Sequence, residues 1–335
     1  MRERALEDLR CPRCRRERTL VLDVRERTPT EVRTGNVECR ACGRRGAVEG
    51  GVVDLLEDPP DFVVREAAGL ARFADVMRAD GWDRERILAL PNDPSPYWYG
   101  QRVTFEALNR RVDYRPGQRL LDVGSNTCWA AAAFARQGLD VVALDIARHE
   151  LQGLDTARWW MERDGTYFER VLGVMFDMPF TSGSLDHVFC CEVLHHNTLR
   201  NLARTFREAF RVLRPGGTLT VARETLRTPL SPQWRPGHEV AEFEGNEHAF
   251  LASTYLVAAR AAGFAVRIED PAGHWALGGA PFTLDESTPL PASLKLAALN
   301  AVRRTPALRR AHRAWVYGVT GESPLSFVCR KPTRA

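Results

Sequence analysis

Residues 120–145 combine strand and helix patterns in an order that strongly restricts the fold. The segment reads LLDVGSNTCWAAAAFARQGLDVVALD, in which two short runs rich in valine and leucine flank a stretch typical of a helix. A strand–helix–strand order predicts two parallel strands joined by a crossover helix. We therefore expect an α/β fold with a doubly wound sheet, in which a ligand binds at the carboxyl ends of the central strands.

The turn between the first strand and the helix bears on the kind of ligand. A dinucleotide fingerprint needs glycine at positions 124, 126 and 129, but this chain has Gly124, Asn126 and Trp129. A tryptophan at the third position would prevent the helix from packing closely on the strand. This argues against NAD or FAD.

The loop and the segments after it resemble class I S-adenosylmethionine (SAM)-dependent methyltransferases of the type 11-like group. The family's first loop reads acidic-x-Gly-x-Gly-x-Gly, and the register here gives Asp122, Gly124, Asn126 and Cys128. Asparagine is the non-glycine residue best able to hold a positive φ, and cysteine is small, so the loop can keep its shape. The resemblance implies that Asp122, Gly124, Ser125 and Asn126 bind the cofactor SAM.

The same resemblance assigns cofactor contacts after the next three strands. Asp145 ends the second strand and would accept both ribose hydroxyls, with Ile146 beside it. The segment MFDMPF is expected to end the third strand, which would place Asp177 and Met178 against the adenine. Cys191 ends the fourth strand, SLDHVFCC, and completes the predicted cofactor site.

Later segments predict the rest of the sheet. REAFRVLRPGGTLTV reads as a helix, a turn and a fifth strand, STYLVAARAAGFAVRIED as a helix and a sixth strand, and PLSFVCRK as a seventh. The resemblance implies a Rossmann-like, seven-stranded sheet of order 3-2-1-4-5-7-6 over residues 113–335. Insertions are expected at about 225–250 and at 271–323, the second containing a helix over 292–305.

Four cysteines near the start of the chain have the spacing of a metal site. Cys11 and Cys14 form one Cys-x-x-Cys hook, and Cys39 and Cys42 form another. Two such hooks predict tetrahedral Zn²⁺ within a short β-ribbon over residues 1–57. The segment resembles the zinc ribbons of bacterial rRNA guanine methyltransferases and the small activator subunit of several tRNA and protein methyltransferases. Such a ribbon can touch RNA, hold a partner or brace the next domain.

Residues 58–112 are expected to form a helical cap or linker. Apolar residues recur at intervals of three and four in 61–82 and again in 97–112, which predicts two helices. Helices in this position commonly cover the mouth of an active site. Tyr97, Trp98 and Tyr99 could line that mouth, or could pack as ordinary core aromatics.

The candidate catalytic residues follow the fourth and fifth strands. Glu192, His195 and His196 lie where the fourth strand would face the transferred methyl group, and are the first place to seek a base. Glu247 and His248 form an acid and imidazole pair further on. Structural use of these histidines, as core or capping residues, is the alternative.

Three functional hypotheses remain open from the sequence. The first is an enzyme, a SAM-dependent methyltransferase that acts on a small-molecule metabolite in specialised metabolism. The second is an RNA (rRNA or tRNA) methyltransferase, whose arginine-rich segments around 10–18 and 303–313 would bind phosphates. The third is a non-catalytic SAM-binding protein.

The composition limits the setting in which this chain would work. No apolar run reaches the length of about 18 residues that a membrane span needs, and no signal peptide is recognisable. We therefore expect a cytoplasmic protein without a membrane partner. The net charge of +4 is modest, so a solvated surface is an alternative to an RNA footprint. The oligomeric state is left open.

Overall fold

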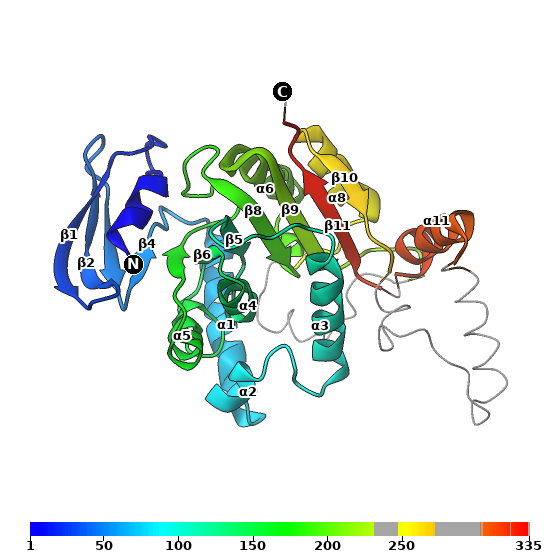
Figure 1. Ribbon diagram of the computed structural model, residues 1–335, viewed down its shortest axis with the longest axis horizontal. Coiled ribbons are helices and arrows are strands. Elements are labelled where there is room, and N and C mark those ends of the chain that lie inside the picture. Colours follow the sequence, from blue (N-terminus) through cyan, green and yellow to red (C-terminus); the bar gives the residue numbers. More distant parts are fainter. Residues whose placement is uncertain (231–246, 272–301, 303, 322, 334–335) are drawn as a thin grey trace.

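The computed structural model describes residues 1–230, 247–271, 302, 304–321 and 323–333 (Figure 1). One mixed sheet runs through this part of the chain, with strand order β1-β2-β3-β4-β7-β6-β5-β8-β9-β11-β10. The strands are β1 (Leu20–Arg27), β2 (Val32–Cys39), β3 (Arg45–Glu49), β4 (Val52–Asp54), β5 (Arg119–Val123), β6 (Asp140–Asp145), β7 (Glu169–Leu172), β8 (Leu185–Cys191), β9 (Leu213–Glu224), β10 (Ala265–Ile268) and β11 (Leu325–Arg330).

The strands β5 to β11 have the α/β arrangement expected from the sequence. In their own order of appearance they run 3-2-1-4-5-7-6, with the last strand, β11, antiparallel to β9. The sheet as a whole differs from the prediction because it does not stop at seven strands. The ribbon was expected as a separate module, but β4 pairs in parallel with β7, matching Val52 to Arg170 and Val53 to Val171. Both valines are buried, so the ribbon extends the same sheet.

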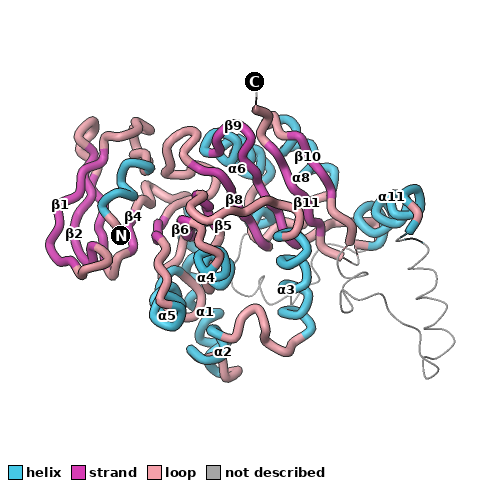
Figure 2. Tube along the Cα trace, viewed as in Figure 1, coloured by secondary structure: helices cyan, strands magenta, loops and turns pink. Residues whose placement is uncertain are grey.

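Helices cover both faces of the sheet (Figure 2). The helical segments are η1 (Glu3–Asp8), α1 (Asp61–Ala79), α2 (Arg84–Leu88), α3 (Pro96–Asn109), α4 (Trp129–Arg136), η2 (Leu154–Thr156), α5 (Ala157–Asp164), η3 (Leu194–His196), α6 (Leu199–Val212), α8 (Ala252–Ala261), α11 (Pro306–Trp315) and η4 (Val316–Thr320). One apolar cluster joins residues of α1 to α5 to the sheet. A second joins α6 and α8 to the sheet, and it includes Val37, Val48 and Leu55 of the ribbon.

Trp129 shows how the loop tolerates a bulky residue where a dinucleotide fold needs glycine. Its indole is buried and packs edge-on against Phe105 of α3, with ring centroids 5.0 Å apart. Trp98 of α3 contacts the same indole at 6.0 Å. The Trp129 side chain therefore joins the helical cap to α4. Trp98 packs as an ordinary aromatic residue, which was one of the two expectations for it.

The helical cap covers the edge of the sheet where the parallel strands end. α1 and α3 form over the predicted segments, and α2 lies between them. The predicted bounds of the three regions, 1–57, 58–112 and 113–335, remain a prediction. Of the two expected insertions, residues 231–246 and 272–301 lie outside the described residues, as does most of the helix expected over 292–305. Within the described part, α11 belongs to the second insertion, and no helix is long and apolar enough to cross a bilayer.

Candidate functional site

The loop between β5 and α4 has the left-handed backbone that the sequence predicted. Gly124, Asn126 and Cys128 have φ values of +67°, +42° and +57°. A side chain at Gly124 would place its Cβ 2.2 Å from the Cγ2 atom of Val193, so this position excludes any larger residue. The loop therefore keeps a glycine-like path although two of its glycines are replaced.

Asp122 supports this loop from below. Its carboxylate accepts a hydrogen bond of 2.6 Å from the Ser125 hydroxyl, and its side chain is almost fully buried. Burial raises the pKa of Asp122 to about 7. Both residues were predicted to bind the cofactor, and the structure shows that they fix the shape of the loop.

Asp145 lies at the end of β6, beside the loop. Its Oδ2 accepts a hydrogen bond of 2.8 Å from the Asn126 N–H, and its Oδ1 accepts from the N–H groups of Ile146 and Ala147 at 2.7 and 3.0 Å. Burial raises the pKa of this carboxyl. The Asn126 side chain donates to Gln152 Oε1 at 2.7 Å, so the loop and the end of β6 form one hydrogen-bonded unit.

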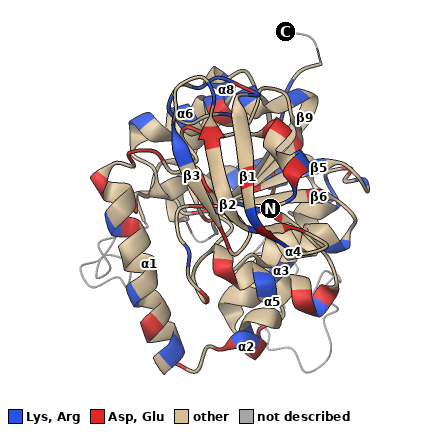
Figure 3. Ribbon diagram, turned by 90° about the vertical axis from the view of Figure 1, so that its left-hand side faces the viewer, with Lys and Arg blue, Asp and Glu red and all other residues tan. Residues whose placement is uncertain are grey.

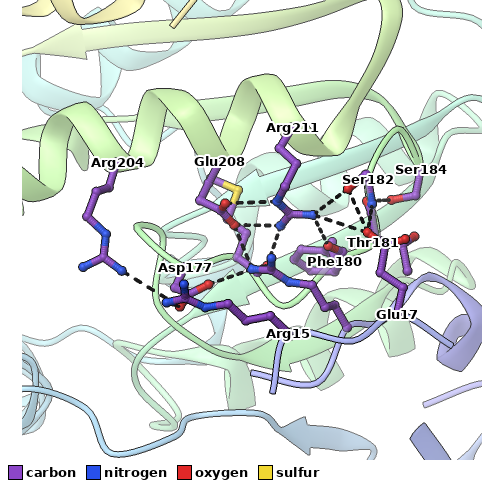
Figure 4. Close-up of polar contacts among 12 residues, drawn as sticks. Arg15, Glu17, Asp177, Phe180, Thr181, Ser182, Ser184, Arg204, Glu208 and Arg211 are labelled. Atoms are coloured by element: carbon purple, nitrogen blue, oxygen red, sulfur yellow. Dashed lines mark hydrogen bonds and ion pairs between the residues drawn. The ribbon is translucent and has the colours of Figure 1, made fainter. Parts of the chain in front are cut away.

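The third strand ends earlier than MFDMPF, which changes the interpretation of Asp177 and Met178. β7 stops at Leu172, and Asp177 lies beyond that end at the ribbon. Its Oδ2 accepts from Arg15 at 2.7 Å (Figure 4), and its Oδ1 accepts from Arg10 at 2.6 Å. Met178 is completely buried. The predicted adenine contacts at these two residues do not match this geometry.

Asp177 belongs instead to a charged network between the ribbon and α6. Arg10 also donates to Glu208 Oε2 at 3.0 Å, and Arg211 donates to the same oxygen at 2.7 Å. Both arginines donate in addition to the Met178 carbonyl oxygen, at 3.2 and 2.9 Å. Since the Arg10 side chain is only 8% exposed, this network is part of the interior.

Glu224 organises the turn that follows β8. It ends β9, is fully buried, and accepts hydrogen bonds of 3.1, 3.0 and 3.1 Å from the N–H groups of Val193, Leu194 and His195. Its Oε2 also lies 3.0 Å from His195 Nδ1. The carboxylate therefore positions both the backbone and the imidazole of His195.

His196 points to a different carboxylate. Its Nδ1 lies 2.6 Å from Glu66 Oε1, which α1 supplies. Burial lowers the pKa of His196, but the charge of Glu66 outweighs this effect and raises the pKa to about 9. At neutral pH this imidazole is protonated, and it cannot take up a proton as a general base in this state.

Glu247, rather than His248, completes this group. The potential ligand atoms of His195, His196 and Glu247 all lie within 4.8 Å of one another. The His248 N–H donates to the His195 carbonyl oxygen at 2.8 Å, and burial lowers the pKa of the His248 imidazole. The main chain of His248 thus fixes residues 247–248 beside η3. The side chain of Glu247 lies near His195 and His196.

Glu192 directly follows β8 and contacts α3. It has a φ of +49°, and its carboxylate accepts short hydrogen bonds from the Tyr97 hydroxyl and the Gln101 amide. Arg223, whose φ is +57°, donates to the same carboxylate at 3.0 Å. Two neighbouring strands therefore end in left-handed residues, a strained arrangement that is common at functional sites.

Cys191 precedes Glu192 and faces the same helix. Its thiol donates to Gln101 Oε1 at 3.1 Å, and burial raises its pKa well above the usual value. It is therefore a neutral thiol that lines the end of β8.

The four ribbon cysteines lie close enough together to hold one metal ion. Their sulfur atoms lie within 4.8 Å of one another, and the distances Cys11–Cys42 and Cys14–Cys39 are both 3.7 Å. Zinc–sulfur bonds of about 2.3 Å place tetrahedral ligands about 3.8 Å apart. The four cysteines therefore fit the predicted Zn²⁺.

Comparison with known proteins concerns mainly the central segment. Residues 121–221 match the family described as "Methyltransferase domain". This segment is therefore similar in sequence to methyltransferase domains. Methyltransferase GfsG of Streptomyces halstedii is 33% identical over 133 residues, which cover 39% of this chain and 46% of GfsG.

Two further similarities extend beyond this segment. A demethylmenaquinone methyltransferase of Beutenbergia cavernae is 32% identical over 185 residues, covering 54% of this chain and 63% of that protein. A structure of Haemonchus contortus phosphoethanolamine N-methyltransferase 2 with S-adenosyl-L-methionine aligns with a TM-score of 0.45 at 17% identity, covering 69% of this chain and 52% of that one. The chain spans less than two thirds of the length of either curated relative.

Most of the predicted site residues lie at one edge of the sheet. The loop residues and Asp145 lie at the ends of β5 and β6, Cys191 ends β8, and Glu192, His195 and His196 follow it. Sequence reasoning missed Glu66, Gln101, Arg223 and Glu224. Glu224 could have been found, because it ends the strand next to β8; the α1 and α3 residues gave no such signal.

Proposed function

We propose that this chain is a SAM-dependent methyltransferase that acts on a small molecule. The observation that carries the proposal is the hydrogen-bonded unit of a left-handed loop and a terminal carboxylate, in which Asn126 N–H meets Asp145. In a doubly wound sheet, adjacent strand ends of this kind bind a nucleoside and its charged tail.

The structure refines how the cofactor would be held. A carboxylate oxygen accepts about two hydrogen bonds, so Asp145 Oδ1 is occupied by its two backbone donors while Oδ2 keeps one position. We therefore assign one ribose hydroxyl to Oδ2 rather than both hydroxyls to the pair of oxygens. The adenine would lie against the residues that directly follow β7, since the Gly173 N–H donates to the Asp145 carbonyl oxygen at 2.9 Å.

Methyl transfer requires alignment of the acceptor with the sulfonium more than it requires acid–base work. After β8, Glu192 is held by Arg223 and His196 is held by Glu66, so both side chains have fixed positions near the ends of β8 and β9. These residues would orient a polar acceptor, and α1 and α3 would exclude water. A small acceptor is favoured because relatives include enzymes named for demethylmenaquinone.

An RNA acceptor has less support in the structure than in the sequence. Arg10 and Arg15 of the ribbon pair with Asp177, and Arg13 and Arg44 pair with Glu57. Figure 3 shows basic and acidic residues alternating along the ribbon of α1 rather than separated into a basic stripe. These four arginines are therefore paired with carboxylates, although Arg13 and Arg15 are exposed while Arg10 and Arg44 are buried.

Cofactor binding and methyl transfer can be tested separately. Calorimetry with SAM should give binding that Asp145→Ala weakens at least tenfold, whereas Asp140→Ala, at the opposite end of β6, should leave it unchanged. Transfer of label from methyl-labelled SAM into a metabolite extract, compared with rRNA, then tests the acceptor class. Label found only in RNA would reject the small-molecule proposal, and binding without any transfer would favour a non-catalytic SAM-binding protein.

We further propose that Cys11, Cys14, Cys39 and Cys42 bind one structural Zn²⁺. Its support is the sulfur spacing described above, and its chemistry would be to fix the two hooks of the ribbon.

A further inference from the structure

The two histidines and the glutamate after β8 converge from separate parts of the chain. His195 and His196 belong to η3. Glu247 directly precedes His248, whose N–H donates to the His195 carbonyl oxygen. The ligand atoms of His195, His196 and Glu247 lie within 4.8 Å of one another. Nitrogen and oxygen ligands of a single transition metal ion lie about 3–3.5 Å apart, given bonds of about 2.0–2.2 Å. The side chains would need to close by no more than about 1.8 Å.

Both imidazoles are oriented in the way that metal-binding histidines are. The Nδ1 atom of His195 is held by Glu224 at 3.0 Å, and that of His196 by Glu66 at 2.6 Å. A carboxylate on one ring nitrogen fixes the ring and makes the other nitrogen a better ligand. The two rings lie side by side, with centroids 4.4 Å apart and planes inclined by 33°.

The charge of this group favours a cation. Glu66, Glu224 and Glu247 bring three carboxylates to two imidazoles, and Glu66 and Glu224 are only 8% and 0% exposed. Among the described residues, the ion pairs of Glu66 and Glu224 are made with these same histidines. Buried carboxylates require compensating positive charge, and a divalent ion that displaces the proton of His196 would supply it in place of the imidazolium.

We propose that His195, His196 and Glu247 bind a divalent transition metal ion. The ligands would be Nε2 of each histidine and a carboxylate oxygen of Glu247, with Glu224 and Glu66 as positioning residues behind them. Two imidazoles and one carboxylate suit Zn²⁺, Fe²⁺, Co²⁺ or Ni²⁺ and leave coordination positions open for another ligand.

The role of such an ion rests on the proposed function. It would lie beyond β8, where the acceptor faces the methyl group, and it would bind a hydroxyl acceptor and lower its pKa. The acceptor O–H loses its proton to solvent. Its oxygen then bonds to the methyl carbon as the carbon–sulfur bond breaks, and the electron pair of that bond stays on sulfur as S-adenosylhomocysteine. The acceptor class assigned by this site is an alcohol or phenol.

Cobalt titration of the full chain, purified with zinc in the ribbon, tests the site without cofactor or acceptor. We expect one Co²⁺ per chain, with weak visible bands of nitrogen and oxygen ligation and with the zinc content unchanged. Exchange into the ribbon would instead release zinc and give an intense thiolate-to-cobalt band. Cobalt uptake that occurs only with such release overturns the proposal, as does the absence of uptake.

Variants locate the ion. His196→Gln and Glu247→Gln should each weaken cobalt binding at least tenfold, and Glu66→Gln should weaken it by about tenfold through orientation of His196. His149→Gln and Glu150→Gln, the same residue types in the loop after β6, are the matched controls and should bind as the parent protein does. Circular dichroism checks that each variant is folded. Equal affinity in folded His196→Gln and Glu247→Gln would overturn the site, whatever the outcome of the methyl-transfer assay.

Discussion

Replacement of Arg10 by methionine should destabilise the whole domain, although Arg10 lies in the ribbon. The guanidinium is buried and donates to Asp177, Glu208 and the Met178 carbonyl oxygen. Breaking a buried ion pair costs about 3–5 kcal/mol when the partner is left alone. Here Asp177 keeps Arg15 and Glu208 keeps Arg211, so we expect a loss of about 2–3 kcal/mol. The methionine preserves most of the apolar stem.

Thermal unfolding measures this loss, and the ribbon offers a matched control. Arg45 pairs with Glu38 on the surface, where the two side chains are 76% and 45% exposed, so Arg45→Met should change stability by less than about 0.5 kcal/mol. At about 2 °C per kcal/mol, Arg10→Met should lower Tm by about 5 °C. If both variants melted together with the parent protein, the Asp177 network would not join the ribbon to the domain.

Three further predictions concern the ribbon metal and the loop. Metal analysis should find one zinc per chain, which Cys39→Ser removes and Cys329→Ser, a cysteine outside the ribbon, retains. Stability should fall as pH rises from about 4 to about 7, because the native state holds the Asp122 proton more tightly than the unfolded chain does. In Asp122→Asn this fall should be absent, and its free energy of unfolding at pH 8 should exceed that of the parent protein by about 2–4 kcal/mol. The check compares Tm at pH 5 and at pH 8 for both proteins. Gly124→Ala should abolish SAM binding in calorimetry, because of the positive φ and the Val193 contact, while Asn126→Gly should retain it.

The loop between β5 and α4 could be predicted from the sequence, whereas the partners of the residues after β8 could not. The loop conformation at Asn126 could be expected locally, because asparagine tolerates a positive φ better than other non-glycine residues. Asp145 could be placed at the strand end because the apolar pattern of the strand stops there. Glu66 reaches His196 only because α1 packs across the strand ends, which is a tertiary contact. The error at Asp177 was one of register: β7 has only four residues, and the apolar run after it looked like its continuation.

From the parallel pairing of β4 with β7 we predict that zinc and SAM affect each other's affinity. The proposed zinc would fix the hooks of the ribbon, whose last strand pairs through Asp54 with Leu172. The proposed adenine position begins at Gly173, the next residue. Without the metal, the β4–β7 edge would be less ordered. SAM binding would then have to order this edge, and that cost would lower the affinity for SAM. Affinity coupling is reciprocal, hence SAM must tighten zinc binding by the same factor. We expect a factor of about 5–50, measured as the SAM dissociation constant before and after chelation and as the zinc dissociation constant with and without SAM. Equal SAM affinity in a zinc-depleted chain that has lost the β4–β7 amide protection would show that the two sites are independent.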